Sequence, residues 1–285
     1  MAIVITGASG QLGSELSRQL GGEAIRLSRR QLDITNGDEV TRVLKELRPE
    51  VVINAAAYTQ VDRAEEETER CRKVNVEAVA NLAGACEVLG AVLVQVSTDY
   101  AYDSSPNADK IPWTEKDLPS SPKGVYARSK LDGEAAAARC QRHFIVRTCG
   151  LYGQVDPPGQ ATNFVETMLR LARSRDQLRV IDDQHCTPSS TVDIARAITF
   201  LMHGEAFGLY HITNAGATTW FAFAKEIFRR EGIAMTLEAI TSEAYGATAP
   251  RPRYSVLDTA KYHALGGPEL PDWQTALAAY LATRG

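Results

Sequence analysis

Short apolar, β-branched segments alternate along the chain with longer segments of helical periodicity. The strand-like segments are residues 2–6, 24–27, 51–53, 92–96, 144–147, 178–181 and 209–212. In the segments between them, apolar residues recur at helical spacing: 12–20, 39–47, 74–89, 125–140, 164–172 and 192–202. This alternation is typical of βαβ units around a parallel sheet. We therefore expect an α/β protein with a Rossmann-type, doubly wound parallel sheet.

The last third of the chain lacks this alternation. It contains two helical patterns, 220–230 and 273–282, and predicts a smaller α/β substrate-binding lobe. We expect the dinucleotide-binding domain to comprise residues 1–149 with about 186–213. The substrate-binding lobe then comprises about 150–185 with 214–285. The Pro- and Ser-rich segment 99–123 predicts a long loop, and long loops inside compact domains are usually functional.

A glycine-rich segment, TGASGQLG from Thr6, separates the first predicted strand from the first predicted helix. Glycines in this position allow a tight turn and let the N–H groups of the helix N-terminus approach a pyrophosphate. The GxxGxxG spacing resembles that of short-chain dehydrogenases/reductases. We expect this segment to bind a dinucleotide through Gly7, Ser9, Gly10, Gln11, Leu12 and Gly13.

The residues after the second predicted strand indicate two different cofactors. Asp33 lies about 20 residues beyond the last glycine, where a carboxylate binds the adenosine ribose of NAD. Arg29 and Arg30 come directly after the strand, where two guanidinium groups can bind a 2′-phosphate. We favour NADPH, with NADH tolerated, because the geometry at the strand end matters more than a linear count. Small residues after the third strand would let the cofactor lie across the sheet edge: Ala55, Ala56 and Ala57.

Tyr126 and Lys130 form a Tyr-x-x-x-Lys pair on one predicted helix, so both side chains lie on one face. A nearby ammonium lowers the pKa of a phenol, and the same lysine can bind a nicotinamide ribose. Thr98 ends the fourth predicted strand, where a hydroxyl can hydrogen-bond a substrate carbonyl. These residues predict a reductase in which Tyr126 donates a proton to the substrate carbonyl oxygen and Thr98 hydrogen-bonds the same oxygen. Lys130 lowers the pKa of Tyr126 and binds the nicotinamide ribose.

The chain resembles the extended short-chain reductases that act on nucleotide sugars, and within them the dTDP-4-dehydrorhamnose reductase family. The segments that carry this resemblance run nearly from end to end. They are TGASGQLG from Thr6, LDIT from Leu32, VVINAAAYTQVDRAE from Val51, VSTDYAYD from Val96, VYARSKLDGE from Val125, VRTCGLYG from Val146, DDQHCTPS from Asp182 and RPRYSVLD from Arg251.

The resemblance implies a catalytic triad of Thr98, Tyr126 and Lys130, and an adenine site near Asp33 and Ile34. It also implies that the lobe after residue 149 closes over the sugar nucleotide. Arg251 is a candidate for contacts with the diphosphate, because its charge matches that of the phosphates. The substrate-binding residues that we expect are Asp99, Tyr100, Gly150, Asn163 and Arg251.

Two positions depart from the family pattern. Gly150 stands where the family usually has a tryptophan that packs beside the sugar, and Ala101-Tyr102 replaces Val-Phe. The resemblance therefore implies an altered substrate pocket. We expect that Tyr152 or Tyr102 fills the space beside Gly150, or that the site accepts a bulkier or differently oriented sugar.

Composition narrows the classes of partner. The formal net charge is −4, with no basic excess for nucleic acid or an anionic membrane surface. No apolar stretch approaches about 18 residues and no signal peptide is evident, which predicts a cytoplasmic protein. Five scattered cysteines suit a reducing compartment, and neither they nor the histidines have the spacing of a metal site. The sequence does not decide whether the protein forms a homodimer.

The predicted function is NAD(P)H-dependent reduction of the 4-keto group of a nucleotide-linked deoxysugar, with dTDP-4-dehydrorhamnose as the first candidate substrate. A dehydratase is disfavoured because Tyr100, and not Glu, follows Asp99. Two alternatives remain. One is a nucleotide-sugar epimerase, which would keep its NAD bound through turnover. The other is a non-catalytic dinucleotide-binding regulatory subunit, similar to that of methionine adenosyltransferase.

Overall fold

The computed structural model describes residues 2–102, 111–119, 122–155 and 162–284. Within these ranges, six parallel strands form one sheet in the order β2-β1-β3-β4-β5-β8. Their bounds are β1 (Ile3–Thr6), β2 (Ala24–Leu27), β3 (Val51–Asn54), β4 (Val92–Thr98), β5 (His143–Thr148) and β8 (Gly208–His211). Because β1 pairs with β2 on one side and β3 on the other, the strand order reverses there. The predicted doubly wound fold is confirmed.

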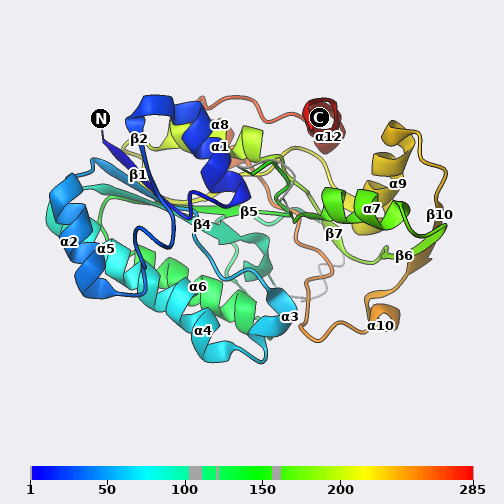
Figure 1. Cartoon of the computed structure of the whole chain (residues 1–285), viewed down its shortest axis with the longest axis horizontal. Coiled ribbons are helices and arrows are strands. Elements are labelled where there is room, and N and C mark those ends of the chain that lie inside the picture. Colours follow the sequence, from blue (N-terminus) through cyan, green and yellow to red (C-terminus); the bar gives the residue numbers. More distant parts are fainter. Residues whose placement is uncertain (1, 103–110, 120–121, 156–161, 285) are drawn as a thin grey trace.

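Helices cover both faces of this sheet (Figure 1). One face is covered by α1 (Gln11–Leu20) and α8 (Thr191–Leu201), and the other by α2 (Gly37–Leu47), α5 (Ala78–Leu89) and α6 (Val125–Ala137). Side chains alternate along a strand, so Ile3 and Ile5 pack in the first of these two cores and Val4 in the second. Burial on both faces explains why the central strands are continuous apolar runs such as VVIN in β3.

The long helix predicted after β3 is interrupted in the structure. The chain forms α3 (Val61–Ala64), α4 (Thr68–Arg72) and a π-helical turn, η2 (Lys73–Glu77), before α5 begins. Asn75 in this turn is buried, and its side chain hydrogen-bonds the backbone N–H and C=O of Tyr58. Such π turns are frequent at functional sites. Apolar periodicity did not predict it, because the residue that organises the turn is polar.

The second lobe contains two small sheets. In one, β6 (Gln177–Ile181) pairs in parallel with β10 (Thr236–Ile240), and in the other β7 (His185–Cys186) pairs antiparallel with β9 (Thr218–Thr219). They pack with α7 (Phe164–Ala172), α9 (Trp220–Glu231) and α12 (Trp273–Thr283) around a separate core. β10 was not predicted, because it is only 5 residues long and most of its side chains are exposed.

The remaining elements are short: η1 (Gly21–Glu23), η3 (Asp99–Ala101), α10 (Ser242–Tyr245) and α11 (Ala260–His263). Tyr262 of α11 and Leu270 pack in the core of the six-stranded sheet, although they lie in the range expected for the substrate lobe. The division of the chain into 1–149 with 186–213 and 150–185 with 214–285 stays a proposal.

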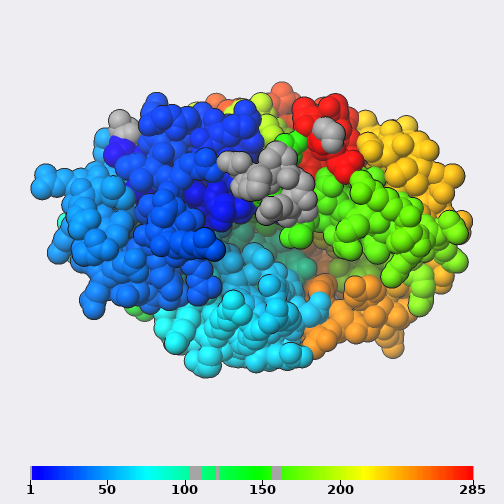
Figure 2. Space-filling model, viewed as in Figure 1, coloured from blue at the N-terminus to red at the C-terminus, as the bar shows by residue number. Residues whose placement is uncertain are grey.

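The first half of the chain and the second lobe lie side by side, and the surface is hollowed where they meet (Figure 2). Parts of the predicted loop 99–123, residues 103–110 and 120–121, lie outside the described residues. No helix in the described ranges is both long enough and apolar enough to cross a bilayer.

Candidate active site

The glycine-rich segment forms a cradle of backbone at the start of α1. Gly7 has φ of +69°, and a Cβ there would lie 2.5 Å from the backbone nitrogen of Ala56. A Cβ at Gly13 would lie 2.2 Å from the carbonyl oxygen of Gly7. Gly10 precedes the helix, whose first turn contains no acidic side chain. The N-terminal N–H groups therefore face a space that suits the pyrophosphate of a dinucleotide.

A cavity of about 330 Å³ adjoins this cradle. Nine of the predicted cofactor residues line it: Gly7, Ser9, Gly10, Arg29, Asp33, Ile34, Ala55, Ala56 and Ala57. Six others do not: Gln11, Leu12, Gly13, Arg30 and the two residues of the Tyr-x-x-x-Lys pair, Tyr126 and Lys130. Leu12 is in the hydrophobic core beneath α1, and Arg30 is exposed. Consecutive residues of a helix point in different directions, so a motif contains lining and packing residues together.

Arg29 and Asp33 both line the cavity, and Arg29 Nη2 lies 4.0 Å from Asp33 Oδ2. Asp33 Oδ1 accepts hydrogen bonds from the hydroxyl and the N–H of Thr35, at 2.8 and 3.0 Å. The hydroxyl bond is the main cause that lowers the pKa of Asp33. Arg29 has a side chain that is 72% exposed. Of the two arginines expected to bind a 2′-phosphate, only Arg29 is placed at the cavity.

Thr98, Tyr126 and Lys130 come together at the carboxyl edge of the sheet. Thr98 is the last residue of β4, and the other two lie on α6. Lys130 Nζ donates a hydrogen bond to the carbonyl oxygen of Val96 at 2.7 Å. Thr98 lies close enough to Tyr126 to lower the pKa of its phenol. Tyr100 packs edge to face on the Tyr126 ring, with centroids 5.7 Å apart.

Burial sets the protonation states of Tyr126 and Lys130. Burial raises the pKa of Tyr126 above its ordinary value, and the neighbouring Thr98 only partly opposes it. The net effect is a raised pKa, and the lowering contribution expected from Lys130 stays a prediction. Burial lowers the pKa of Lys130 to about 8, against the opposing charge of Glu134. At neutral pH the site pairs a neutral phenol with a mainly charged ammonium.

Asp99 lies behind these residues. It is 2% exposed and its Oδ1 accepts a hydrogen bond from Thr98 at 3.2 Å, while Oδ2 has no hydrogen-bond partner. Burial raises its pKa. Like Thr98, Tyr126 and Lys130, Asp99 lines neither the cavity beside the glycine cradle nor the cavity in the second lobe, and its contact with a substrate stays a prediction.

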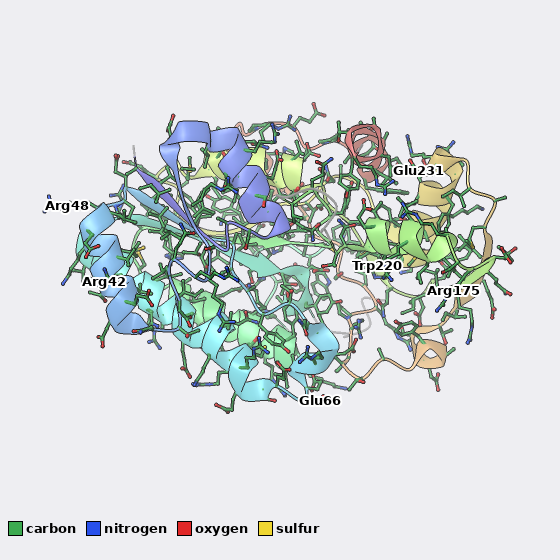
Figure 3. The ribbon with its side chains drawn as sticks, in the orientation of Figure 1. Arg42, Arg48, Glu66, Arg175, Trp220 and Glu231 are labelled. Atoms are coloured by element: carbon green, nitrogen blue, oxygen red, sulfur yellow. The ribbon has the colours of Figure 1, made fainter. Side chains whose placement is uncertain are left out.

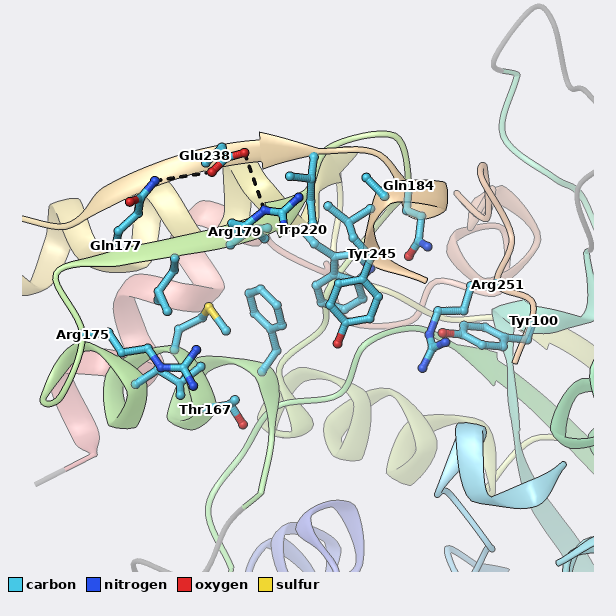
Figure 4. A pocket seen from close by; sticks show the side chains of 18 residues that line it. Tyr100, Thr167, Arg175, Gln177, Arg179, Gln184, Trp220, Glu238, Tyr245 and Arg251 are labelled. Atoms are coloured by element: carbon cyan, nitrogen blue, oxygen red, sulfur yellow. Dashed lines mark hydrogen bonds and ion pairs between the residues drawn. The ribbon is translucent and has the colours of Figure 1, made fainter. Parts of the chain in front are cut away.

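A larger cavity, of about 780 Å³, opens beside Tyr100 and extends into the second lobe (Figure 4). Tyr100 and Arg251 stand at one end of it, and Arg175 and Arg179 stand at the other. Its apolar walls include three aromatic side chains: Phe164, Trp220 and Tyr245. Guanidinium groups combined with aromatic surfaces suit a ligand that carries both phosphates and flat rings.

Residues 1–284 match the family described as "RmlD substrate binding domain". The chain belongs to this RmlD family. A dTDP-4-dehydrorhamnose reductase of Streptomyces griseus is 42% identical over 285 residues, with 96% of this chain and 91% of that protein covered. The resemblance predicted from the motifs is confirmed at the level of the family.

Solved structures agree with this membership. The crystal structure of a dTDP-4-dehydrorhamnose reductase from Clostridium acetobutylicum is 39% identical, with a TM-score of 0.93 and 99% of both chains covered. That of a dTDP-4-dehydrorhamnose reductase from Bacillus anthracis in complex with NADP is 35% identical, with a TM-score of 0.92 and 99% of both chains covered.

In this member of the RmlD family, the space beside Gly150 is filled by Trp220. Gly150 has φ of +51°, and a Cβ there would lie 3.0 Å from Trp220 Cη2 and 3.2 Å from the Cα of Pro188. Trp220, labelled in Figure 3, begins α9. Its ring packs on Phe164 with centroids 4.7 Å apart. The expectation that Tyr152 or Tyr102 fills this space is wrong, because the atoms nearest to this Cβ position belong to Trp220 and Pro188. Tyr152 packs in the core of the second lobe, and Tyr102 stacks on Trp113.

Gln11 and Asn163 were expected to bind cofactor and substrate, but the structure brings them into contact with each other. Asn163 Nδ2 and the backbone N–H of Gly153 both donate to Gln11 Oε1, at 2.9 Å. Asn163 also caps α7 by accepting a hydrogen bond from the N–H of Glu166. Neither Gln11 nor Asn163 lines the described cavities, so both connect α1 of the first lobe to α7 of the second.

Arg251 is also engaged across the lobes. Its Nη1 and Nη2 bind the two carboxylate oxygens of Asp62, at 3.0 and 2.7 Å. It lines the larger cavity, as the expected diphosphate contact requires.

Several lining residues were missed from the sequence, among them Arg70 at the smaller cavity and Arg175, Arg179 and Trp220 at the larger one. Arg70 lies on the short helix α4, and the other three line the larger cavity from different parts of the second lobe. No local motif marks them. In the described ranges, no cluster of three or more His, Cys, Asp or Glu side chains could hold a metal ion.

Proposed function

We propose that this protein is an NADPH-dependent dTDP-4-dehydrorhamnose reductase, which reduces the 4-keto group of the sugar to give dTDP-L-rhamnose. The observation that carries the proposal is the position of Tyr126 between the two cavities. It packs in one cluster with Tyr58, which lines the smaller cavity, and against Tyr100, which lines the larger one. The names of the relatives, and NADP in the Bacillus anthracis structure, point to the same reaction.

The smaller cavity is the proposed dinucleotide site. The glycine cradle receives the pyrophosphate, Asp33 and Ile34 border the adenine, and Arg29 binds the 2′-phosphate. When bound, NADPH supplies the hydride that reduces the carbonyl carbon. The exposed guanidinium of Arg29 can reach a phosphate without being desolvated first. NADH lacks this phosphate, so we expect it to be the poorer cofactor.

The chain itself supplies the proton and the charge that the carbonyl oxygen needs. As that oxygen gains negative charge, Tyr126 donates its phenolic proton to it and Thr98 donates a hydrogen bond. A tyrosine whose pKa is raised by burial stays protonated at neutral pH, which is the form that a proton donor needs. The Lys130 ammonium beside it stabilises the negative charge that passes to the phenol oxygen.

The larger cavity is the proposed site for the nucleoside diphosphate and sugar. Arg251, Arg175 and Arg179 offer positive charge to the phosphates. The aromatic wall formed by Phe164 and Trp220 offers flat surfaces to the rings. Tyr100 reaches from the catalytic residues to this cavity, so it borders the sugar.

The test incubates purified protein with NADPH and enzymatically generated dTDP-4-dehydrorhamnose. The near-ultraviolet absorbance of NADPH is followed, and the sugar product is identified. We expect stoichiometric oxidation of NADPH and formation of dTDP-L-rhamnose. Interconversion of sugars without net consumption of NADPH, with NAD that copurifies, would identify an epimerase. Dinucleotide binding without turnover of any nucleotide sugar would favour a regulatory subunit.

Two expectations from the sequence remain predictions beside this proposal. One is the cytoplasmic location of the enzyme. The other is a homodimer, which multi-angle light scattering of the purified protein tests directly.

A further inference from the structure

Helix α6 carries a second buried charged residue one turn after Lys130. Glu134 is 8% exposed, and its carboxylate is enclosed by donors from two strands. Oε1 accepts a hydrogen bond from Ser97 Oγ at 2.5 Å and from Arg147 Nε at 2.9 Å. Oε2 accepts one from Arg147 Nη2 at 2.6 Å. These bonds fasten α6 to β4 and to β5 directly behind the catalytic group.

The partners of Glu134 are themselves held in place. Arg147 Nη1 donates to the hydroxyl of Tyr102 at 2.7 Å, and that hydroxyl lies 3.1 Å from Nε2 of His211 on β8. Burial lowers the pKa of His211 to about 4, so this ring is neutral. The network is closed to solvent, with Arg147 3% exposed and Tyr102 fully buried.

A buried ion pair of this kind seldom stabilises a fold more than apolar residues of the same size would. Its place along the chain suggests another role. Ser97 lies between Val96, whose carbonyl accepts the Lys130 hydrogen bond, and Thr98 of the catalytic group. Side chains four residues apart on a helix are neighbours, so Glu134 lies next to Lys130.

We propose that Glu134, held by Ser97 and Arg147, is a positioning residue that keeps the Lys130 ammonium charged and fixed at the end of β4. This inference rests on the proposed reductase function, because Lys130 acts there as a cation beside Tyr126. Burial disfavours the charged form of Lys130, and the carboxylate of Glu134 is the first opposing influence. The titratable groups that act on Lys130 are Glu134 on the same helix and Cys71 on α4, and Glu134 is faced in turn by Arg147 on β5 and by Tyr102.

The direction of the effect follows from these charges. Removing the negative charge of Glu134 leaves Arg147 unpaired and burial less opposed, and both favour neutral Lys130. The pKa of Lys130 should then fall from about 8 to near or below neutrality. Lys130 would lose its proton in the range where the wild-type protein keeps it.

The test is Glu134→Gln, which keeps the shape of the side chain. Lysine labelled with ¹³C at Cε reports ionisation by NMR in the protein without cofactor or substrate, and Lys130→Arg assigns the signal. We expect the Lys130 midpoint to fall by about one pH unit or more. With cofactor and substrate, the alkaline limb of the kcat profile should move in the same direction. A folded Glu134→Gln protein with the wild-type Lys130 midpoint would overturn the proposal.

Ser97→Ala is the matched control, because it removes a hydrogen bond to Glu134 without changing any charge. We expect it to lower thermal stability and leave the Lys130 midpoint in place; an equal fall in that midpoint would reduce Glu134 to a structural role and overturn the proposal. If Glu134→Gln does not fold, Glu134→Gln with Arg147→Met removes both charges together. Its Lys130 midpoint should still lie below that of the wild type, and an unchanged midpoint would overturn the proposal. A wild-type protein inactive on dTDP-4-dehydrorhamnose would reject the proposed function, while the NMR titration would still decide this inference.

Discussion

The smaller and the larger cavity of the candidate active site are bounded by different kinds of atoms. The smaller one is bounded mainly by backbone and short side chains, such as Gly7, Gly10 and Ala56, at the ends of adjacent strands. The larger one is bounded by long side chains from separate elements, such as Arg175, Trp220 and Arg251. A backbone wall is set once the sheet forms, whereas a side-chain wall can change without changing the fold. The dinucleotide site is thus tied to the architecture, and the substrate site to individual substitutions.

The largest effect should come from Tyr126, which packs with Tyr58 of the smaller cavity and with Tyr100 of the larger one. Tyr126→Phe keeps the ring that packs on Tyr100 and removes only the proton donor. We expect turnover to fall by roughly two to four orders of magnitude, with NADPH affinity nearly unchanged. Stopped-flow turnover and a fluorescence titration of NADPH measure the two quantities. A variant that retains more than about a tenth of wild-type turnover would remove Tyr126 from this role.

A single methyl group added at Gly13 should disrupt the backbone wall of the smaller cavity. In Gly13→Ala the new Cβ would meet the Gly7 carbonyl at 2.2 Å, so α1 must move away from β1. We expect about 100-fold weaker NADPH binding, measured by calorimetry.

Gly84→Ala is the matched control for Gly13→Ala. Gly84 lies within α5 with open space around the added methyl group, and the change should stabilise the protein by about 0.5 to 1 kcal/mol. If Gly13→Ala binds NADPH as tightly as Gly84→Ala does, the tight packing of the cradle does not determine binding.

Loss of Arg29, which lines the smaller cavity and is proposed to bind the 2′-phosphate, should affect binding of one cofactor and not the other. Arg29→Ala should weaken NADPH binding by about 1.5 to 3 kcal/mol, through the loss of charged hydrogen bonds, and leave NADH nearly unchanged. Arg30→Ala should change neither, because Arg30 does not line the cavity. Comparing KM for the two cofactors in both variants checks this. Equal losses for NADPH and NADH in Arg29→Ala would shift the discrimination to Asp33.

The larger cavity should still bind the nucleotide sugar, more weakly, when one of its lining side chains is truncated. Trp220→Ala removes a flat surface that packs on Phe164 and faces the larger cavity. We expect a KM for the nucleotide sugar higher by about fivefold, corresponding to about 1 kcal/mol, with the KM for NADPH unchanged. Trp220→Phe should recover part of the loss. An equal rise in both KM values would mean that Trp220 supports the whole fold and not the wall alone.

The same distinction explains what could be predicted from the sequence. The cradle, the Tyr-x-x-x-Lys pair and Thr98 are local patterns that each lie on one element, and the structure brings them together. The wall depends on contacts such as that between Gly150 and Trp220, which lie 70 positions apart in the numbering. β10 carries little apolar signal because its side chains face solvent. Residues within a motif were also overassigned, since Leu12 points into the core and not toward the cofactor.

The link between Gln11 and Asn163 has a consequence for protein engineering. Chimaeras that join the cradle of one relative to the substrate lobe of another treat the two lobes as interchangeable modules. Here one side-chain oxygen, Gln11 Oε1, accepts hydrogen bonds from the Gly153 backbone and from the Asn163 amide that caps α7. A chimaera that changes only Gln11 or only Asn163 leaves polar groups without partners in a buried position. Positions 11 and 163 therefore have to be transplanted together.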